Sequence, residues 1–171
     1  MRIGVPKEIL PGETRVAVSP DSIKKFMGLG VEFLVQSGAG DTASMPDGLL
    51  ESAGARIVAD AATLYGEADM VFKVGGPCCN GSGTVDELAM MKPDTVLIGL
   101  LNPLFQREQA AAYAKHGLTS FAMELIPRIS RAQSMDALSS QSNIAGYKAV
   151  IDAAETFGKI LPMMMTAAGT I

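Results

Sequence analysis

Short and almost wholly apolar runs recur six times along the chain, and segments with the spacing of amphipathic helices separate them. The runs cover residues 2–6, 31–35, 55–58, 69–74, 95–101 and 118–125. Strands of this kind belong to parallel sheets that are covered on both faces. The pattern therefore predicts an α/β fold: a parallel, doubly wound, flavodoxin-like sheet of about six strands with helices on both faces.

The starts of the intervening helices can be placed by their capping residues. Ser19 or Asp21 is suited to cap the first helix, and Pro20 lies close to its first turn. Thr84, followed three residues later by Glu87, has the form of a capping box before a helix over 84–91. The other expected helices cover residues 46–53, 60–65 and 105–115.

The longest helix is expected after the last apolar run. It is predicted over residues 135–161 and is closed by Pro162. The residues on its apolar face are Ile144, Tyr147, Ile151, Ala154 and Leu161. This face exposes more apolar surface than six short strands need, so the helix could serve dimerisation.

Composition and charge exclude several classes of function. The 171 residues carry a net charge of −4 and a pI of 5.0, whereas binding to nucleic acid normally needs a basic face. No apolar run reaches the roughly 18 residues that span a bilayer. The N-terminus, M-R-I-G-V-P-K-E, lacks the apolar core of a signal peptide. The chain is expected to be cytosolic, without a membrane span of its own.

Residues that commonly bind metals or act as nucleophiles are few. Cys78 and Cys79 are adjacent, and no second pair completes a metal site, so they are expected to be incidental thiols in a loop. His116 is the only histidine, and its place at the end of an expected helix favours a structural role. We therefore predict no metal site and no Ser-His-Asp chemistry.

Residues 127–143 form the most polar stretch of the chain. Eleven of these seventeen positions are charged, hydroxyl or amide residues, and none is glycine, although surface loops usually contain glycine turns. Ligands of parallel sheets gather beyond the carboxyl ends of the strands, a rule that collects 7–15, Lys73, Asn102 and 128–139 at one edge. The stretch is either a site for a polar ligand or a well-capped connection between two elements.

No dinucleotide fingerprint is found in the chain. The glycine clusters at 38–40 and 75–83 lack a third glycine at the required offset, and no helix opens directly from them. The residues alone therefore assign no cofactor.

Several motifs nevertheless carry a family resemblance. The chain opens with I-G-V-P-K-E and P-G-E-T-R-V-A-V-S-P, its fourth apolar run contains V-F-K-V, the polar stretch contains R-I-S-R-A-Q-S-M-D, and the chain closes with M-M-M-T-A-A-G-T-I. Together they resemble the alpha subunit of proton-translocating NAD(P) transhydrogenase, within the alanine dehydrogenase/transhydrogenase N-terminal domain family. The R-I-S-R-A-Q-S-M-D run is specific to transhydrogenases, and the opening motif is shared with alanine dehydrogenases.

The resemblance implies a cofactor site without a catalytic acid or base. The residues that it assigns to the nicotinamide end of NAD(H) are Arg128, Gln133, Asp136 and Ser139. NADP(H) would bind to a partner component. Direct hydride transfer between two nicotinamides needs positioning and exclusion of water more than proton transfer. Supporting or capping roles are expected for the neighbouring Arg131, Ser134 and Ser140.

An alanine dehydrogenase-like domain is the alternative enzyme. That resemblance would place a catalytic histidine just after the fifth apolar run, where this chain has Asn102. Arg15 and Lys73 match positions that hold the substrate in alanine dehydrogenases, whereas in a transhydrogenase they would be structural or ion-paired. These two residues are therefore second-tier candidates, and oxidation of an amino acid is the weaker expectation.

The resemblance also implies more protein than this sequence contains. Residues 1–134 would form the N-terminal α/β domain, and residues 135–171 the long helix and the lead-in to an absent Rossmann NAD-binding domain. The chain would form a homodimer and join the membrane and NADP(H)-binding components, peripheral on the cytoplasmic side of the inner membrane. Alone, it is expected to be inactive. A non-catalytic dimerisation module is the remaining alternative.

Overall fold

The computed structural model describes residues 1–78, 85–159 and 165–170 of the chain. The chain divides into two compact units, Met1–Leu125 and Ile126–Ile171. The assignment of domains to 1–134 and 135–171 stays a prediction. Sequence predictions that fall outside the described residues concern Cys79, Thr84, Leu161 and Pro162.

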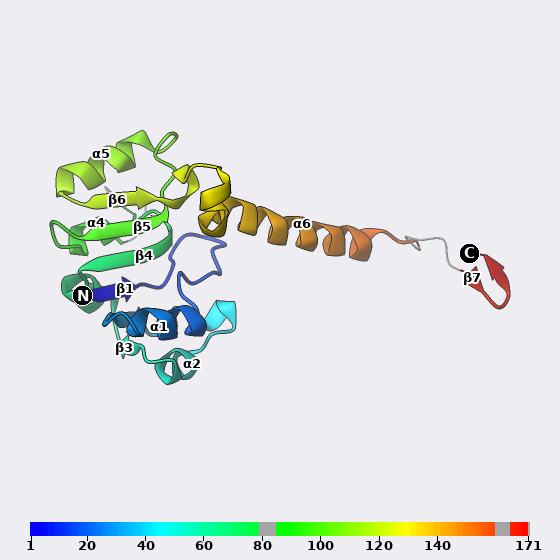
Figure 1. Ribbon diagram of the computed structural model, residues 1–171, viewed down its shortest axis with the longest axis horizontal. Helices are drawn as coiled ribbons and strands as arrows, with labels where there is room; N and C mark the ends of the chain where they lie inside the picture. The colour runs from blue at the N-terminus through cyan, green and yellow to red at the C-terminus, as the bar shows by residue number, and fades with distance from the viewer. Residues whose placement is uncertain (79–84, 160–164, 171) are drawn as a thin grey trace. The chain divides into compact units, whose positions relative to one another are not determined.

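Six parallel strands form the sheet of the first unit (Figure 1), which confirms the predicted fold class. They are β1 (Arg2–Val5), β2 (Glu32–Gln36), β3 (Arg56–Val58), β4 (Met70–Gly75), β5 (Val96–Leu100) and β6 (Thr119–Ala122). Their order is β3-β2-β1-β4-β5-β6, so the order reverses between β1 and β4, where such sheets open a crevice beyond the carboxyl ends of the strands. The predicted run 118–125 was too long, because its last three residues form the 3₁₀ helix η2 (Met123–Leu125).

The helices of the first unit are short, and several begin at a side-chain cap. They are α1 (Pro20–Met27), η1 (Asp41–Ala43), α2 (Asp47–Ser52), α3 (Ala61–Glu67), α4 (Glu87–Met90) and α5 (Arg107–His116). Ser19, not Asp21, caps α1. The predicted start of α4 is corrected: Asp86 caps the helix by accepting a hydrogen bond from the backbone N–H of Ala89.

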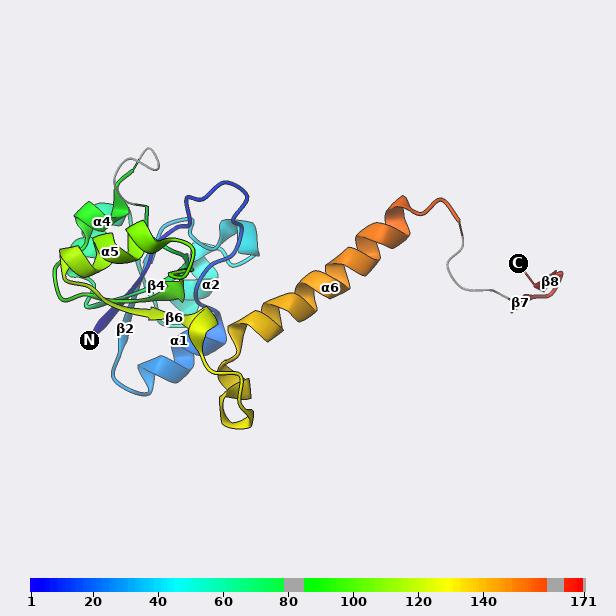
Figure 2. The same cartoon turned by 90° about the horizontal axis from the view of Figure 1, so that it is seen from above.

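Side chains alternate between the two faces of the sheet, and each face has its own apolar core. One core contains Ile3 and Phe33 and includes residues of α1 and α2. The other contains Leu34 and includes residues of α3, α4 and α5. Figure 2 shows α1 on one side of the strands and α4 and α5 on the other. At Gly4, α3 lies so close to β1 that a Cβ would be 2.7 Å from Leu64 Cδ2.

The second unit contains η3 (Ser130–Met135), α6 (Ala137–Thr156), β7 (Met165–Thr166) and β8 (Gly169–Thr170), and the last two pair as an antiparallel hairpin. The predicted helix 135–161 was too long at both ends. Asp136 is the N-cap of α6, and the backbone becomes extended at Phe157, directly before Gly158. Among the described residues, no helix is both long and apolar enough to cross a membrane.

Candidate functional site

The four residues predicted to bind the cofactor lie around one hollow of the second unit. Its volume is about 290 Å³. The residues that line it are Pro127, Arg128, Ile129, Ser130, Ala132, Gln133, Asp136 and Ser139. The structure thus brings Arg128, Gln133, Asp136 and Ser139 together, and their role toward NAD(H) stays a prediction.

The hollow arises where η3 turns into α6. Ile129 enters η3 in an extended conformation, and Ala132 is the buried residue of that helix. Asp136 then ends η3 and begins α6. One oxygen of its carboxylate accepts a hydrogen bond from the backbone N–H of Ser139 at 2.9 Å, and the other accepts one from the Ser139 hydroxyl at 2.6 Å. The stretch is therefore a capped connection and at the same time the wall of a hollow.

The positive charge at this hollow, on Arg128, is exposed to solvent. The Arg128 side chain is 66% exposed, and its Nε lies 3.9 Å from Asp136 Oδ2. The hydrogen bonds from Ser139 hold the pKa of the Asp136 carboxyl below its usual range, and the Arg128 guanidinium adds to this effect. Gln133 is exposed beside them, so its amide can both donate and accept hydrogen bonds. The hollow therefore presents an anion, a cation and an amide within one short segment.

Of the supporting residues, Ser140 has a defined structural contact. Its hydroxyl donates to the backbone carbonyl of Asp136 at 3.1 Å, which ties the first turn of α6 together. This contact agrees with the predicted supporting role and is not a cap, because the hydroxyl donates to a carbonyl of the same helix turn. Arg131 and Ser134 are exposed residues of η3.

The second-tier residue Lys73 lies in the interior of the first unit. Its Nζ is 2.7 Å from Glu87 Oε1 and 3.4 Å from Glu8 Oε2. The three side chains are 1–3% exposed. Glu87 also accepts hydrogen bonds from the Tyr65 hydroxyl at 2.7 Å and from the backbone N–H of Cys78 at 2.9 Å. The Glu87 carboxylate is thus turned into the core, and its predicted capping box with Thr84 stays a prediction, because Thr84 lies outside the described residues.

The other second-tier residue, Arg15, is paired within its own loop. Its guanidinium donates to both carboxylate oxygens of Glu13, at 2.8 and 2.7 Å. Glu13 also accepts a hydrogen bond from the backbone N–H of Arg15 at 2.9 Å. Arg15 and Lys73 are thus both ion-paired with carboxylates of the chain itself.

Asn102 occupies the position at which an alanine dehydrogenase would need its histidine, and it lies in a tight turn of the backbone after β5. Asn102 has φ of 49°, in the left-handed region that asparagine tolerates better than most residues. The Glu124 carboxylate accepts hydrogen bonds from the backbone N–H groups of Leu101, at 3.2 Å, and of Asn102. Sequence reasoning missed Glu124, and a carboxylate inside the apolar run 118–125 was the available signal.

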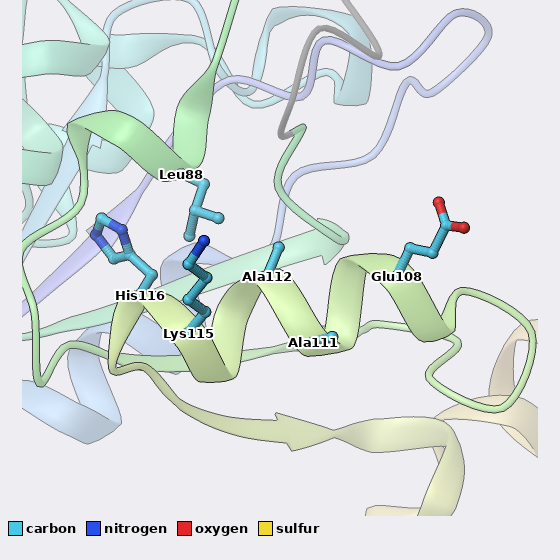
Figure 3. A pocket seen from close by; sticks show the side chains of 6 residues that line it. All are labelled: Leu88, Glu108, Ala111, Ala112, Lys115 and His116. Atoms are coloured by element: carbon cyan, nitrogen blue, oxygen red, sulfur yellow. The ribbon is translucent and has the colours of Figure 1, made fainter.

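A second hollow, of about 470 Å³, lies beside α4 and α5 (Figure 3). Lys115 and His116 lie near Leu88, whereas Glu108 lies toward the other end of α5. His116 Nε2 donates to the backbone carbonyl of Met91 at 2.8 Å, which agrees with a structural role for this histidine. The labelled polar side chains of this hollow do not point toward one another (Figure 3).

Metal and thiol chemistry find no candidate in the part of the chain that the structure describes. No group of three His, Cys, Asp or Glu side chains there could hold a metal ion. The Cys78 thiol is buried, and burial raises its pKa. A thiol of this kind stays protonated and unreactive near neutral pH.

The fold places this chain among the α/β proteins with a doubly wound parallel sheet. The family described as alanine dehydrogenase/PNT, N-terminal domain, matches residues 4–145. The chain belongs to this family.

Its relatives narrow the assignment. An NAD(P) transhydrogenase alpha-subunit polypeptide of Rhodospirillum rubrum is 53% identical over all 171 residues, which cover 44% of that protein. The crystal structure of transhydrogenase from Sinorhizobium meliloti matches with a TM-score of 0.90 and 46% identity, over 100% of this chain and 49% of that one. L-alanine dehydrogenase matches with a TM-score of 0.78 and 32% identity, over 91% and 40%. The chain corresponds to the N-terminal portion of a transhydrogenase alpha subunit and spans less than half the length of these relatives.

Proposed function

We propose that this chain forms the nicotinamide-side wall of the NAD(H) site in an NAD(P) transhydrogenase. The complete enzyme would transfer hydride from NADH to NADP⁺ held by a partner component, and this transfer would be coupled to proton translocation. The observation that carries the proposal is the convergence of Arg128, Gln133, Asp136 and Ser139 on one hollow, in a chain 53% identical to a transhydrogenase alpha subunit.

The chemistry of these side chains suits the carboxamide of a nicotinamide. A carboxylate has about four lone-pair positions. Ser139 occupies one on each Asp136 oxygen, which leaves acceptor capacity for the carboxamide N–H groups. Gln133 can complete a paired amide–amide contact, and Arg128 can hold the ribose–pyrophosphate end. The cofactor itself carries the hydride, so the task of these residues is to bind, orient and exclude water.

An alanine dehydrogenase activity is the weaker candidate. Asn102 occupies the position of the needed histidine, has a positive φ, and donates its backbone N–H to the Glu124 carboxylate. Lys73 and Arg15, the residues that would hold a small substrate, are engaged by Glu87, Glu8 and Glu13.

A dimerisation role for α6 is compatible with the transhydrogenase proposal. Ile144, Tyr147 and Val150 are 61%, 72% and 67% exposed on this helix. We include in the proposal a homodimer, membrane and NADP(H)-binding partner components, and a peripheral position on the cytoplasmic side of the inner membrane. The division into domain 1–134 and a connecting segment 135–171, leading into a Rossmann domain, also belongs to the proposal.

The test uses the complete alpha subunit with its partner components. Gln133→Asn withdraws the amide by one methylene, and we expect the rate of NADH-to-NADP⁺ hydride transfer to fall about tenfold, which corresponds to roughly 1.4 kcal/mol. Gln106→Asn is the matched control, because Gln106 is also exposed but lies before α5. Equal rates for the two variants would refute the assignment of the site.

A separate measurement addresses the 171-residue chain. With only one wall of the site present, it should bind NADH weakly or not at all. Isothermal titration that shows micromolar binding of NADH would contradict a shared site.

A further inference from the structure

Two carboxylates share one ammonium group in the interior of the first unit. The side chains of Glu8, Lys73 and Glu87 are 2%, 1% and 3% exposed. If all three were ionised, the cluster would carry one uncompensated negative charge away from water, which is costly. Arg15, whose charge also acts on Glu8, is already paired with Glu13.

The two carboxylates differ in the number of hydrogen bonds that they accept. Three donors converge on Glu87: the Lys73 ammonium, the Tyr65 hydroxyl and the backbone N–H of Cys78. Glu8 accepts one hydrogen bond, from the backbone N–H of Val74 at 2.6 Å. Its other oxygen, Oε2, is buried and has no hydrogen-bond partner within residues 1–78, 85–159 and 165–170. Glu87 is thus better stabilised as an anion than Glu8, so Glu8 is the carboxylate of the two that gains more from holding a proton.

We propose that the buried Glu8 keeps its proton to a higher pH than an ordinary glutamate, and that the protonated carboxyl keeps the loop 6–19 seated on the carboxyl end of β4. With Glu8 neutral, the cluster consists of one ammonium and one carboxylate and carries no net charge. Burial raises the pKa of the Glu8 carboxyl, the Lys73 ammonium offsets this effect only in part, and Glu87 adds to the rise.

The loop 6–19 is held against the end of β4 by contacts of Glu8 and of Leu10. Its carboxyl binds the backbone of Val74, near the end of β4. Two residues along the loop, Leu10 packs against Gly75, where a Cβ would lie 2.7 Å from Leu10 Cδ1. Ionisation of Glu8 would place a second anion beside Glu87 with one ammonium between them. The loop would then lower the free energy by moving Glu8 into water.

The other titratable groups that face Glu8 are Lys73 on β4, Glu87 on α4, Tyr65 on α3, Cys78 after β4, and Arg15 in the loop itself. Burial raises the pKa of the Tyr65 hydroxyl and of the Cys78 thiol, so both stay neutral.

The direction of the pH dependence follows from the raised pKa. The seated loop binds the proton more tightly than the released loop, so seating is strongest below the ordinary glutamate pKa of about 4.3. It weakens as the pH rises through the higher pKa of the folded state. Each unit of elevation makes release about tenfold easier at alkaline pH.

Carboxyl-carbon NMR of the ¹³C-glutamate-labelled 171-residue chain tests the proposal over a pH titration. The Glu8 resonance, assigned by its loss in Glu8→Gln, should titrate above the ordinary glutamate value. The Val74 amide should exchange faster at alkaline pH than intrinsic chemistry explains, by about tenfold per pKa unit. In Glu8→Gln this excess should vanish, because the amide is neutral at every pH.

Two further variants complete the design. Glu51→Gln, at an exposed glutamate of α2, should keep the Glu8 titration and the excess Val74 exchange. Glu87→Gln removes the competing carboxylate and should lower the pKa of Glu8. A Glu8 carboxyl that titrates at or below the ordinary value would overturn the proposal, as would a Glu8→Gln chain that retains the excess exchange.

Discussion

The Lys73 cluster and the hollow at residues 127–139 combine the same kinds of groups with opposite exposure. In the cluster, the ammonium lies 2.7 Å from a carboxylate, and both side chains are 1–3% exposed. At the hollow, Arg128 and Asp136 lie 3.9 Å apart, and their side chains are 66% and 18% exposed. A buried pair is satisfied by its own chain and cannot be released cheaply, whereas an exposed pair can exchange solvent for a ligand. Burial therefore separates a structural ion pair from a candidate binding site.

Removing the cation of the buried cluster should have the largest effect. Lys73→Met leaves the Glu87 carboxylate without its counter-ion in the core. We expect the free energy of unfolding to fall by about 3–5 kcal/mol, the usual cost of breaking a buried ion pair. Urea denaturation of the 171-residue chain, followed by circular dichroism, measures it.

Lys92→Met is the matched control for this substitution. Lys92 lies 3.7 Å from Asp69, with side chains 43% and 49% exposed, so its loss should change the free energy of unfolding by no more than about 0.5 kcal/mol. Equal losses for the two lysine variants would break the distinction between the buried and the exposed pair.

The next largest effect is expected at the cap of α6. Asp136→Ala removes the acceptor of the Ser139 N–H, and we expect the amides of the first turn to exchange roughly fivefold faster, since helix caps of this type have effects of that order. Asp136→Asn should retain most of the protection, because asparagine also caps helices. Hydrogen exchange followed by NMR compares the three chains. Similar exchange in the alanine variant and the unaltered chain would show that the hollow does not depend on this cap.

Most of the fold was readable from the sequence because the strands are buried on both faces and the loops carry local signals. Ser19, for example, caps α1 through a partner only three residues away. What the sequence did not indicate were contacts between residues far apart in the chain. The Glu87 carboxylate binds Lys73, fourteen residues earlier, a contact that its capping-box spacing from Thr84 does not predict. The Glu124 carboxylate binds the backbone N–H of Leu101, directly after β5, and Glu124 lies in η2, beyond the end of β6 at Ala122.

The candidate site was predictable for a different reason. Arg128, Gln133, Asp136 and Ser139 are close in sequence, so one 3₁₀ turn and the start of a helix suffice to gather them. Their hydrogen-bond capacity follows from residue type. The Glu8–Lys73–Glu87 cluster unites three separate elements, and no local pattern in the sequence indicates such a contact.

The two regions should also respond to opposite ends of the pH scale. The pKa of Asp136 is lowered by the Ser139 hydrogen bonds, so its contribution to the start of α6 is complete above the ordinary aspartate value of about 3.9 and is lost as the pH falls through the lower pKa of the folded state. The Ser139 amide shift, followed by NMR in acid, should show this step, and Asp136→Asn should abolish it. A step above the ordinary value would contradict the assigned hydrogen bonds.

The smallest effect on stability is expected at Arg128. Its side chain is mostly in solvent and its nearest approach to Asp136 is 3.9 Å, so Arg128→Met should change the free energy of unfolding by no more than about 0.5 kcal/mol. In the complete alpha subunit, the same substitution should weaken NADH binding about tenfold or more, because a charge-assisted contact contributes roughly 1.5–3 kcal/mol. Arg131→Met is the control. Arg131 is an exposed residue of η3 that does not line the hollow, so its substitution should leave NADH binding nearly unchanged. If Arg128→Met destabilises the chain and spares binding, Arg128 is a structural cation like Lys73. Burial would then not separate structural ion pairs from binding residues, because Arg128 is mostly exposed.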